Sequence, residues 1–164
     1  MTIFKNTNPG ASPETKGSFF MKTINKTATE VFCRLLRKLA ERQYIKLVSE
    51  GYMPLSMECI LENIETPYGD AKLYSLCHYF EQNGDLMRDP EMCFLVVDNR
   101  TESNQYELIG IYPQMYRLDS LGIDQESIRI ENSKMVSFRE AMQRDHAIFA
   151  CLWMKNIKQQ GFLK

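Results

Sequence analysis

This sequence predicts an α+β fold: an antiparallel sheet of four to five strands flanked by an N-terminal and a C-terminal helix. Apolar residues with helical spacing occur near the two ends of the chain, and strand-like apolar runs fill the middle. Short turns connect these runs, which favours antiparallel neighbours because a parallel pair needs a longer crossover. Two amphipathic helices are enough to cover one face of such a sheet.

The N-terminal helix is predicted over residues 28–50. Thr27 and Glu30 have the spacing of a capping box, in which each side chain bonds a free amide of the first turn. Gly51 is a typical residue just beyond a helix end. The preceding residues carry Asn-Pro-Gly and Ser-Pro and lack periodicity. We therefore expect a flexible N-terminal arm over 1–24 and a single α+β domain over 25–164.

A second capping box, at Ser137 and Glu140, begins the C-terminal helix. An apolar stripe follows, and Gly161 is placed to end the helix. His146 lies next to charged residues within this helix, so we expect it on a partly exposed face.

The middle of the chain supplies the sheet. Its strands are predicted near residues 56–65, 72–82, 92–98 and 105–112, with one more short strand at 127–131. The run from Leu73 to Phe80 is apolar at successive positions, which is typical of a central strand that is buried on both faces. Pro113 is predicted to end the fourth strand, because proline cannot donate a hydrogen bond to a neighbouring strand.

Composition limits the function classes. The net charge of −1 and the pI of about 6.2 do not favour a nucleic-acid partner. The sequence contains no Walker A motif, no G-x-G-x-x-G fingerprint and no G-x-S-x-G elbow. We therefore expect no cofactor. The five cysteines are an odd number and most lie in apolar runs, which indicates reduced, buried thiols. No apolar run is long enough for a membrane span, and we expect a cytoplasmic protein.

The predicted N-terminal helix carries cations on its polar face. A solvated helix face accounts for them, while a nucleic-acid-binding surface is the alternative. The candidate residues for that alternative are Arg34, Arg37, Lys38, Arg42 and Lys46.

The segment 82–92 is the strongest local candidate for a functional site. It combines an Asn-Gly and an Asp-Pro turn signal with three acidic side chains and one arginine. Turn chemistry alone can explain it. If it is instead a surface that contacts a partner, the contact residues are Asn83, Asp85, Arg88, Asp89 and Glu91. A further alternative is a hydrolase or nuclease whose divalent cation is held by Asp85, Asp89, Glu91 and His78.

Residues His78 to Met92 read His-Tyr-Phe-Glu-Gln-Asn-Gly-Asp-Leu-Met-Arg-Asp-Pro-Glu-Met. This segment resembles the signature of an uncharacterised domain family of bacterial phages, plasmids and conjugative elements. The resemblance is close over this segment and looser over the flanking strands, up to about Leu118. It implies mobile-element biology, in which small proteins often counter host defence or handle DNA. It implies no particular reaction.

The leading functional hypothesis is therefore a non-catalytic cytoplasmic protein of a mobile element that binds another protein, such as a host defence factor. A metal-dependent hydrolase or nuclease that uses the acidic residues of 85–91 is the first alternative. A nucleic-acid-binding accessory protein is the second alternative. No membrane partner is expected.

Overall fold

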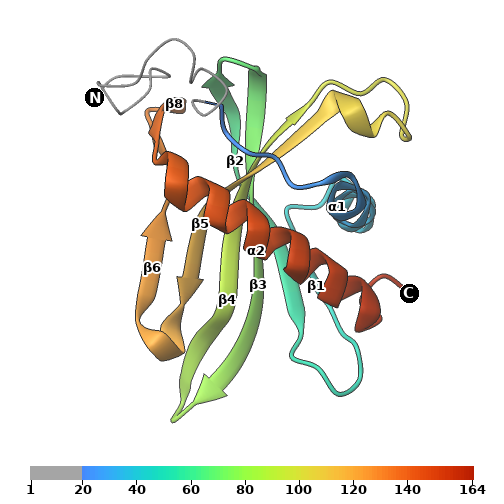
Figure 1. Cartoon of the computed structure of the whole chain (residues 1–164). Helices are drawn as coiled ribbons and strands as arrows, with labels where there is room; N and C mark the ends of the chain where they lie inside the picture. The colour runs from blue at the N-terminus through green and yellow to red at the C-terminus, as the bar shows by residue number, and fades with distance from the viewer. Residues whose placement is uncertain (1–19) are drawn as a thin grey trace.

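Residues 20–164 are described by a computed structural model. Within these residues, two α-helices and an eight-stranded sheet form the α+β fold that the sequence predicts (Figure 1). The helices α1 (Lys26–Leu39) and α2 (Glu140–Gln159) lie near the two ends of the chain. The predicted four to five strands are too few, because the prediction leaves out several short strands.

The strands are β1 (Tyr44–Leu47), β2 (Leu55–Thr66), β3 (Gly69–Gln82), β4 (Asp85–Asp98), β5 (Ile109–Leu118), β6 (Ile123–Glu126), β7 (Ile128–Glu131) and β8 (Lys134–Phe138). Their order in the sheet is β6-β5-β4-β3-β2-β8-β7, and β1 also pairs with β2. The 3₁₀-helices η2 (Tyr106–Leu108) and η3 (Asp119–Leu121) flank β5. All strand pairs are antiparallel as predicted, except that β2 and β8 run parallel.

The sheet curls back on itself. Its first and last strands in spatial order, β6 and β7, are joined by the single residue Ser127. The Ser127 amide donates to the Gln114 carbonyl of β5 at 2.8 Å, and the Gln114 side chain donates to the Ile128 carbonyl of β7 at 2.8 Å. The β7–β8 hairpin therefore covers part of the sheet face that the helices leave open.

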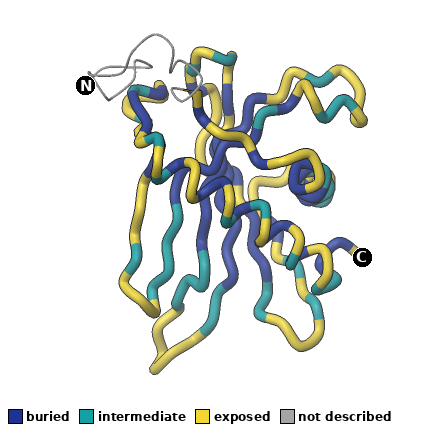
Figure 2. The backbone as a smooth tube through the Cα atoms, viewed as in Figure 1, coloured by how far each residue is buried: buried dark blue, intermediate teal, exposed yellow. Residues whose placement is uncertain are grey.

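The middle of the sheet is buried on both faces (Figure 2). On one face, Tyr74, Leu76 and Phe94 pack with residues of α1 and α2. On the other, Leu73 and Leu95 pack with side chains of β7 and β8 in a second apolar cluster. The prediction that the β3 segment is a central strand is thus confirmed, since both of its neighbours are strands and both of its faces are covered. Four of the five cysteines are buried, also as predicted.

Helix α1 ends at Leu39, well before the predicted residue 50. Arg42 donates to the Leu39 and Lys38 carbonyls, which have no partners within the helix. Beyond this end, Ile45 is buried in β1, which pairs with β2. Residue spacing predicts this segment wrongly, because a strand of four residues is too short to show its own periodicity and forms only against β2.

The caps of both helices differ from the predicted boxes. Asn25 is the N-cap of α1, where its side chain accepts a hydrogen bond from the Ala28 amide at 2.8 Å, so Thr27 lies inside the helix. Arg139 stands at the N-cap of α2 without a capping side-chain bond, and its amide donates to the Ser127 carbonyl. A tertiary contact replaces the predicted Ser137 cap.

Strand β5 continues through Pro113 to Leu118, so the prediction that Pro113 ends this strand is wrong. The pairing with β4 shifts at this point: Pro113 lies opposite Phe94, and Met115 lies opposite Cys93. This irregularity accommodates a residue that cannot donate a hydrogen bond. The extension matters for function, because it brings Tyr116 and Arg117 beside the β3–β4 hairpin.

The predicted N-terminal arm lies outside the described residues up to residue 19. Its last residues pack on the domain: Met21 and Ile24 are buried, and the Ile24 amide donates to the Ile111 carbonyl of β5 at 3.1 Å. No helix among residues 20–164 is long and apolar enough to cross a membrane.

Candidate functional site

The segment 82–92 is the end of a long hairpin rather than an extended loop. Strands β3 and β4 are paired out to Gln82 and Asp85, which leaves only Asn83 and Gly84 in the turn. Both turn residues have positive φ, 53° and 85°, as a two-residue hairpin turn requires. The Asn-Gly signal was therefore interpreted correctly, but the following residues belong to a strand.

A bulge beside His78 decides which way the charged side chains point. Cys77 pairs with Glu91 and Tyr79 pairs with Arg88, so that Asp89 and Pro90 together face His78 alone. An extra residue resets the alternation of side chains between the two faces of a sheet. Arg88 and Glu91 consequently share the face away from the helices, where they approach to 3.8 Å.

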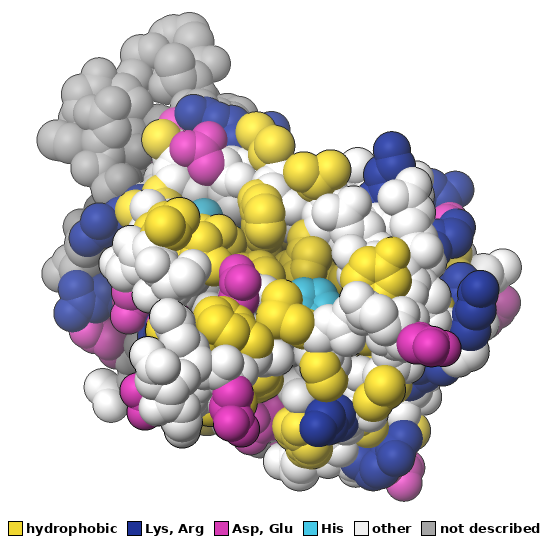
Figure 3. Space-filling view, turned by 90° about the horizontal axis from the view of Figure 1, so that it is seen from below, with side chains coloured by type: hydrophobic (Ala, Val, Ile, Leu, Met, Phe, Trp, Pro, Cys, Tyr) yellow, Lys and Arg dark blue, Asp and Glu magenta, His cyan; other side chains and the backbone are white. Residues whose placement is uncertain are grey.

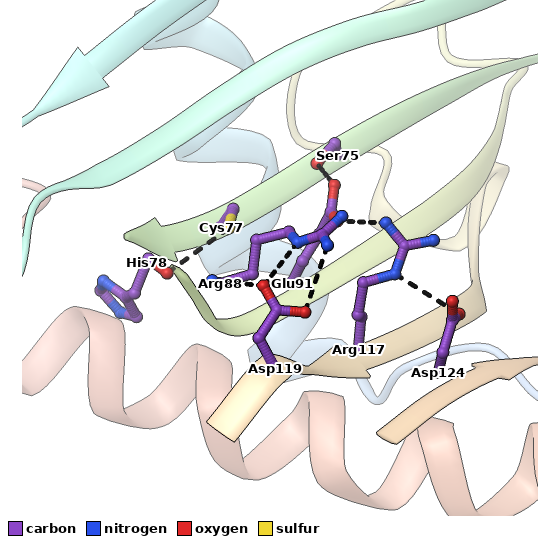
Figure 4. Close-up of polar contacts among 8 residues, drawn as sticks. All are labelled: Ser75, Cys77, His78, Arg88, Glu91, Arg117, Asp119 and Asp124. Atoms are coloured by element: carbon purple, nitrogen blue, oxygen red, sulfur yellow. Dashed lines mark hydrogen bonds and ion pairs between the residues drawn. The ribbon is translucent and has the colours of Figure 1, made fainter. Parts of the chain in front are cut away.

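Glu91 is the centre of a buried polar network on that face (Figure 4). Its side chain accepts a hydrogen bond from the Ser75 hydroxyl at 2.6 Å and one from the Arg117 guanidinium at 3.3 Å. Glu91 is only 8% exposed. A buried carboxylate is tolerated when it is paired and hydrogen-bonded, and here three strands supply the partners.

Arg88 connects this network to the segment after β5. Its Nε atom donates to Asp119 at 2.8 Å, and its backbone amide donates to the same carboxylate at 2.8 Å. These bonds hold the pKa of Asp119 below its usual value. Arg117 in turn forms an ion pair with Asp124 of β6 at 3.4 Å. Two residues predicted as partner contacts, Arg88 and Glu91, thus bind to the protein itself and fix the hairpin to its neighbours.

His78 lies on the opposite face, towards α2. Its Nδ1 atom lies 3.1 Å from the Met53 carbonyl and 3.2 Å from the Pro54 carbonyl. Its ring contacts Trp153 and Phe162, with centroids 5.7 and 5.5 Å apart. Burial lowers the pKa of His78.

Asp89 belongs to the His78 side of the hairpin. Its negative charge acts on His78, where it opposes the effect of burial on the pKa. It also acts on Tyr116, whose pKa is raised by burial first and by Asp89 second. Among residues 20–164, Asp89 has no hydrogen bond or ion pair. The Asp89 side chain is half-buried.

Aromatic side chains surround this position. Tyr116 of β5 contacts Phe149 of α2 with ring centroids 5.0 Å apart, and Phe149 contacts Trp153 at 6.2 Å. Seen from the hairpin end, hydrophobic side chains gather around a depression, and histidine atoms reach the surface among them (Figure 3). Ring contacts connect Tyr116, Phe149, Trp153 and His78, and the charge of Asp89 acts on His78 and Tyr116; we call this group of five residues the hollow.

The tip of the hairpin is exposed. Asn83 and Asp85 project into solvent with Glu81, and Leu86 is 64% exposed beside them. Within the described part of the chain, neither Glu81 nor Asp85 has an ion-pair partner. Of the predicted contact residues, Asn83 and Asp85 are thus exposed at the tip, and Asp89 is half-buried.

The four residues considered for a metal do not converge. Glu91 is on one face of the hairpin, His78 and Asp89 are on the other, and Asp85 is at the tip. Over residues 20–164, no group of three or more His, Cys, Asp or Glu side chains is arranged to hold a metal ion.

The five cations considered for nucleic acid do not share one helix face, because Arg42 and Lys46 lie beyond the end of α1. Arg34 and Lys38 donate to the carbonyls of Leu163 and Lys164 at the C-terminus. Arg42 donates to carbonyls at the end of α1. Several of these side chains are therefore bound to the backbone of the protein.

Sequence reasoning missed the partners of the network, Ser75, Asp119 and Asp124, and the aromatic residues of the hollow. Their residue types carry no signal, since serine, aspartate and tyrosine are common at surfaces and in sheets. The pairing of Glu91 with Arg117 follows from the register between β4 and β5. The prediction that β5 ends at Pro113 places Arg117 outside the strand and therefore excludes this pairing.

His146 is buried rather than partly exposed, which corrects the prediction. Its Nδ1 atom lies 2.8 Å from the Ser127 hydroxyl, and its Nε2 atom lies 3.1 Å from the Gln125 side-chain oxygen. It therefore connects α2 to the junction of β6 and β7. Burial lowers the pKa of His146.

Both histidines make the stability depend on pH. Their pKa values are lower in the folded protein than the ordinary value of 6.5. The unfolded chain thus binds more protons as the pH falls through 6.5, and the stability that is fully present above this value is progressively lost. We expect the free energy of unfolding, measured with urea, to fall between about pH 7.5 and 5.5.

The matched variant for this prediction is His78→Gln/His146→Gln, which retains polar side chains but cannot titrate. Its free energy of unfolding should change less over the same pH range than that of the wild type. An equal slope for both proteins would contradict the assignment of the pH dependence to these two histidines.

The fold and the hairpin define the class of protein: an α+β domain with a curled, mainly antiparallel sheet and two helices on one face. The chain belongs to the family described as "Domain of unknown function (DUF6908)", whose model matches residues 27–163. Neither the curated proteins nor the solved structures include a match to this chain.

Proposed function

We propose that this chain is a non-catalytic, cytoplasmic protein-binding domain of a mobile genetic element. We define the hairpin-end surface as Glu81, Asn83, Asp85, Leu86 and Asp89 together with the hollow. The partner lies against this surface. The partner is a protein whose contact segment carries apolar side chains flanked by lysine or arginine, such as a segment of a host defence factor.

The observation that carries this proposal is the combination of exposed apolar groups and unpaired acids at one end of the molecule. Exposed apolar patches with a polar rim are typical of sites that bind other proteins. Here the apolar part consists of the exposed Leu86 and the half-buried Tyr116 and Phe149, and hydrophobic side chains gather at this end of the molecule (Figure 3). The unpaired carboxylates of Glu81, Asp85 and Asp89 favour a cationic partner, because complementary charges steer association and select the partner.

The polar network on the other face supports this function. The β3–β4 hairpin extends beyond the neighbouring strands (Figure 1), where an isolated two-stranded segment would be mobile. The bonds of Arg88 to Asp119 and of Glu91 to Arg117 fasten it to β5 and η3. A surface held in place before binding loses less conformational entropy when a partner binds, which strengthens the complex.

The mobile-element setting, and with it a host factor as partner, is supported by the resemblance of residues 78–92 to domains of phages, plasmids and conjugative elements. The residues that carry this resemblance are the same ones that build the hairpin end. The bulge at His78 and the turn at Asn83 and Gly84 both fall within it.

Charge reversal at the hairpin end tests the proposal. A tagged pull-down from the native host, followed by mass spectrometry, identifies candidates that the wild type retains. Each candidate is then purified, and its affinity is measured by calorimetry. We expect Asp85→Lys/Asp89→Lys to weaken the affinity at least about tenfold, because two attractive charges become repulsive.

The control is Glu102→Lys/Glu107→Lys, which makes the same charge change in the exposed segment before β5, far from the hairpin tip (Figure 1). It should retain affinity within about twofold, as expected for charges outside the interface. Circular dichroism shows whether both variants are folded. Undiminished binding by the folded Asp85→Lys/Asp89→Lys protein would contradict the proposal.

A further inference from the structure

The hollow contains a free hydrogen-bond acceptor. Carbonyl oxygens only accept hydrogen bonds, so the contacts of His78 Nδ1 with the Met53 and Pro54 carbonyls require the proton to be on Nδ1. In the neutral ring, Nε2 then carries a lone pair. No residue of the described part of the chain forms a hydrogen bond with this Nε2 atom, and it is not among the buried polar atoms that lack a partner. This Nε2 atom therefore has no donor among residues 20–164 and is not fully buried, although His78 as a whole is only 6% exposed.

A negative charge lies close to this acceptor. Asp89 lies opposite His78 at the bulge and its charge acts on both His78 and Tyr116, and its side chain has no hydrogen bond or ion pair within residues 20–164. Arg88, the one cation of the segment 82–92, is on the opposite face and is bound to Asp119. A ligand that binds here thus meets one carboxylate and one neutral acceptor, while the Arg88 guanidinium is held on the other face.

The walls select the shape of the ligand. Tyr116 and Phe149 stand edge to face at 65° and 5.0 Å, and Phe149 contacts Trp153, so aromatic surface surrounds the polar atoms. Aromatic faces attract cations, and they stack best on a planar guanidinium. The aliphatic part of an arginine or lysine side chain also packs well on such surface.

We propose that the hollow binds an arginine side chain of the partner, with its guanidinium paired to Asp89, hydrogen-bonded to His78 Nε2 and stacked on the aromatic wall. This proposal rests on the protein-binding function proposed above, and it names the residue that the hollow recognises. Arginine fits better than lysine because its donors point in several fixed directions within one plane, which suits two separate acceptors.

The test uses a small probe and the full chain. N-acetyl-arginine methylamide is titrated into the protein, and NMR follows the indole N–H signal of Trp153, which is the single tryptophan of the sequence. We expect a saturable shift of this signal. The uncharged citrulline analogue should cause less than about one fifth of that shift, because it lacks the charge that Asp89 attracts. The lysine analogue should bind about threefold more weakly, since it cannot stack as a plane.

Variants of the protein distinguish binding of the probe in the hollow from nonspecific attraction of the probe by exposed carboxylates. Asp89→Asn should weaken binding of the arginine probe at least about fivefold, whereas Asp85→Asn, the same change at the tip, should stay within about twofold. His78→Phe retains an aromatic ring and removes the acceptor, so it should also weaken binding of the arginine probe. Each variant must first show the dispersed NMR spectrum of a folded protein.

Equal shifts from the arginine and citrulline probes, or equal effects of Asp89→Asn and Asp85→Asn, would overturn the inference. A lysine probe that binds as tightly as arginine would overturn the choice of arginine. If the partner protein still depends on Asp85 and Asp89 while the arginine probe causes no shift, only this inference fails. If the arginine probe binds but Asp85→Lys/Asp89→Lys leaves the affinity for the partner protein unchanged, the proposed function fails instead.

Discussion

Phe32→Ala is expected to lower the free energy of unfolding by about 3–5 kcal/mol, as is usual when a large buried aromatic side chain is removed. Phe32 of α1 is 0% exposed. Its ring contacts Phe94 of β4 with a centroid distance of 4.9 Å and Tyr74 of β3 at 6.3 Å. It is therefore the point at which α1 packs on the two central strands. Urea unfolding followed by circular dichroism measures the change.

Two matched variants make this prediction specific. Phe32→Leu keeps most of the apolar volume and should cost about 1–1.5 kcal/mol. Ile148→Ala removes an apolar side chain that is 66% exposed on α2, and it should change stability by less than about 0.5 kcal/mol. A loss below about 1 kcal/mol for Phe32→Ala would show that α1 does not depend on this packing.

Glu91→Ala is expected to lower the free energy of unfolding by about 2–3 kcal/mol, because it removes the common partner of a buried network. Ser75 would lose its acceptor, and the Arg117 guanidinium would lose a carboxylate 3.3 Å away. The expected loss is smaller than for a fully buried ion pair, since the Arg117 side chain is 27% exposed and water can partly solvate it.

Asp85→Ala is the control for Glu91→Ala. It removes a carboxylate from the same strand, but one that is exposed and unpaired among the described residues, so the change should stay below about 0.5 kcal/mol. Glu91→Gln, which retains shape and a hydrogen-bonding group, should fall between the two, near about 1–2 kcal/mol. Equal stabilities for the Glu91→Ala and Asp85→Ala proteins would show that the network does not stabilise the hairpin.

Glu91→Ala also bears on function. If the network fixes the hairpin-end surface, the variant should bind the partner more weakly although Glu91 lies on the other face of the sheet. The loss should be smaller than for Asp85→Lys/Asp89→Lys, because the contact residues themselves remain.

The candidate site shows how far the sequence alone leads. The segment 82–92 was recognised as the place where polar groups concentrate, and its Asn-Gly turn was interpreted correctly. The roles of its charged residues were not separable, because Arg88, Asp89 and Glu91 are neighbours in sequence. Their assignment to opposite faces follows from one bulge, and a bulge becomes visible only in the register between two strands.

Residue patterns are enough to predict the α+β class, the positions of α1 and α2 near the two ends of the chain, and the central strand that is buried on both faces. These features depend on local periodicity, which residue types carry directly. The number of strands in the sheet, its curl through Ser127 and the partners of Glu91 become visible only in the folded chain. A short strand forms only against its neighbour in the sheet, and a buried charge needs partners from other strands, so no local pattern specifies them.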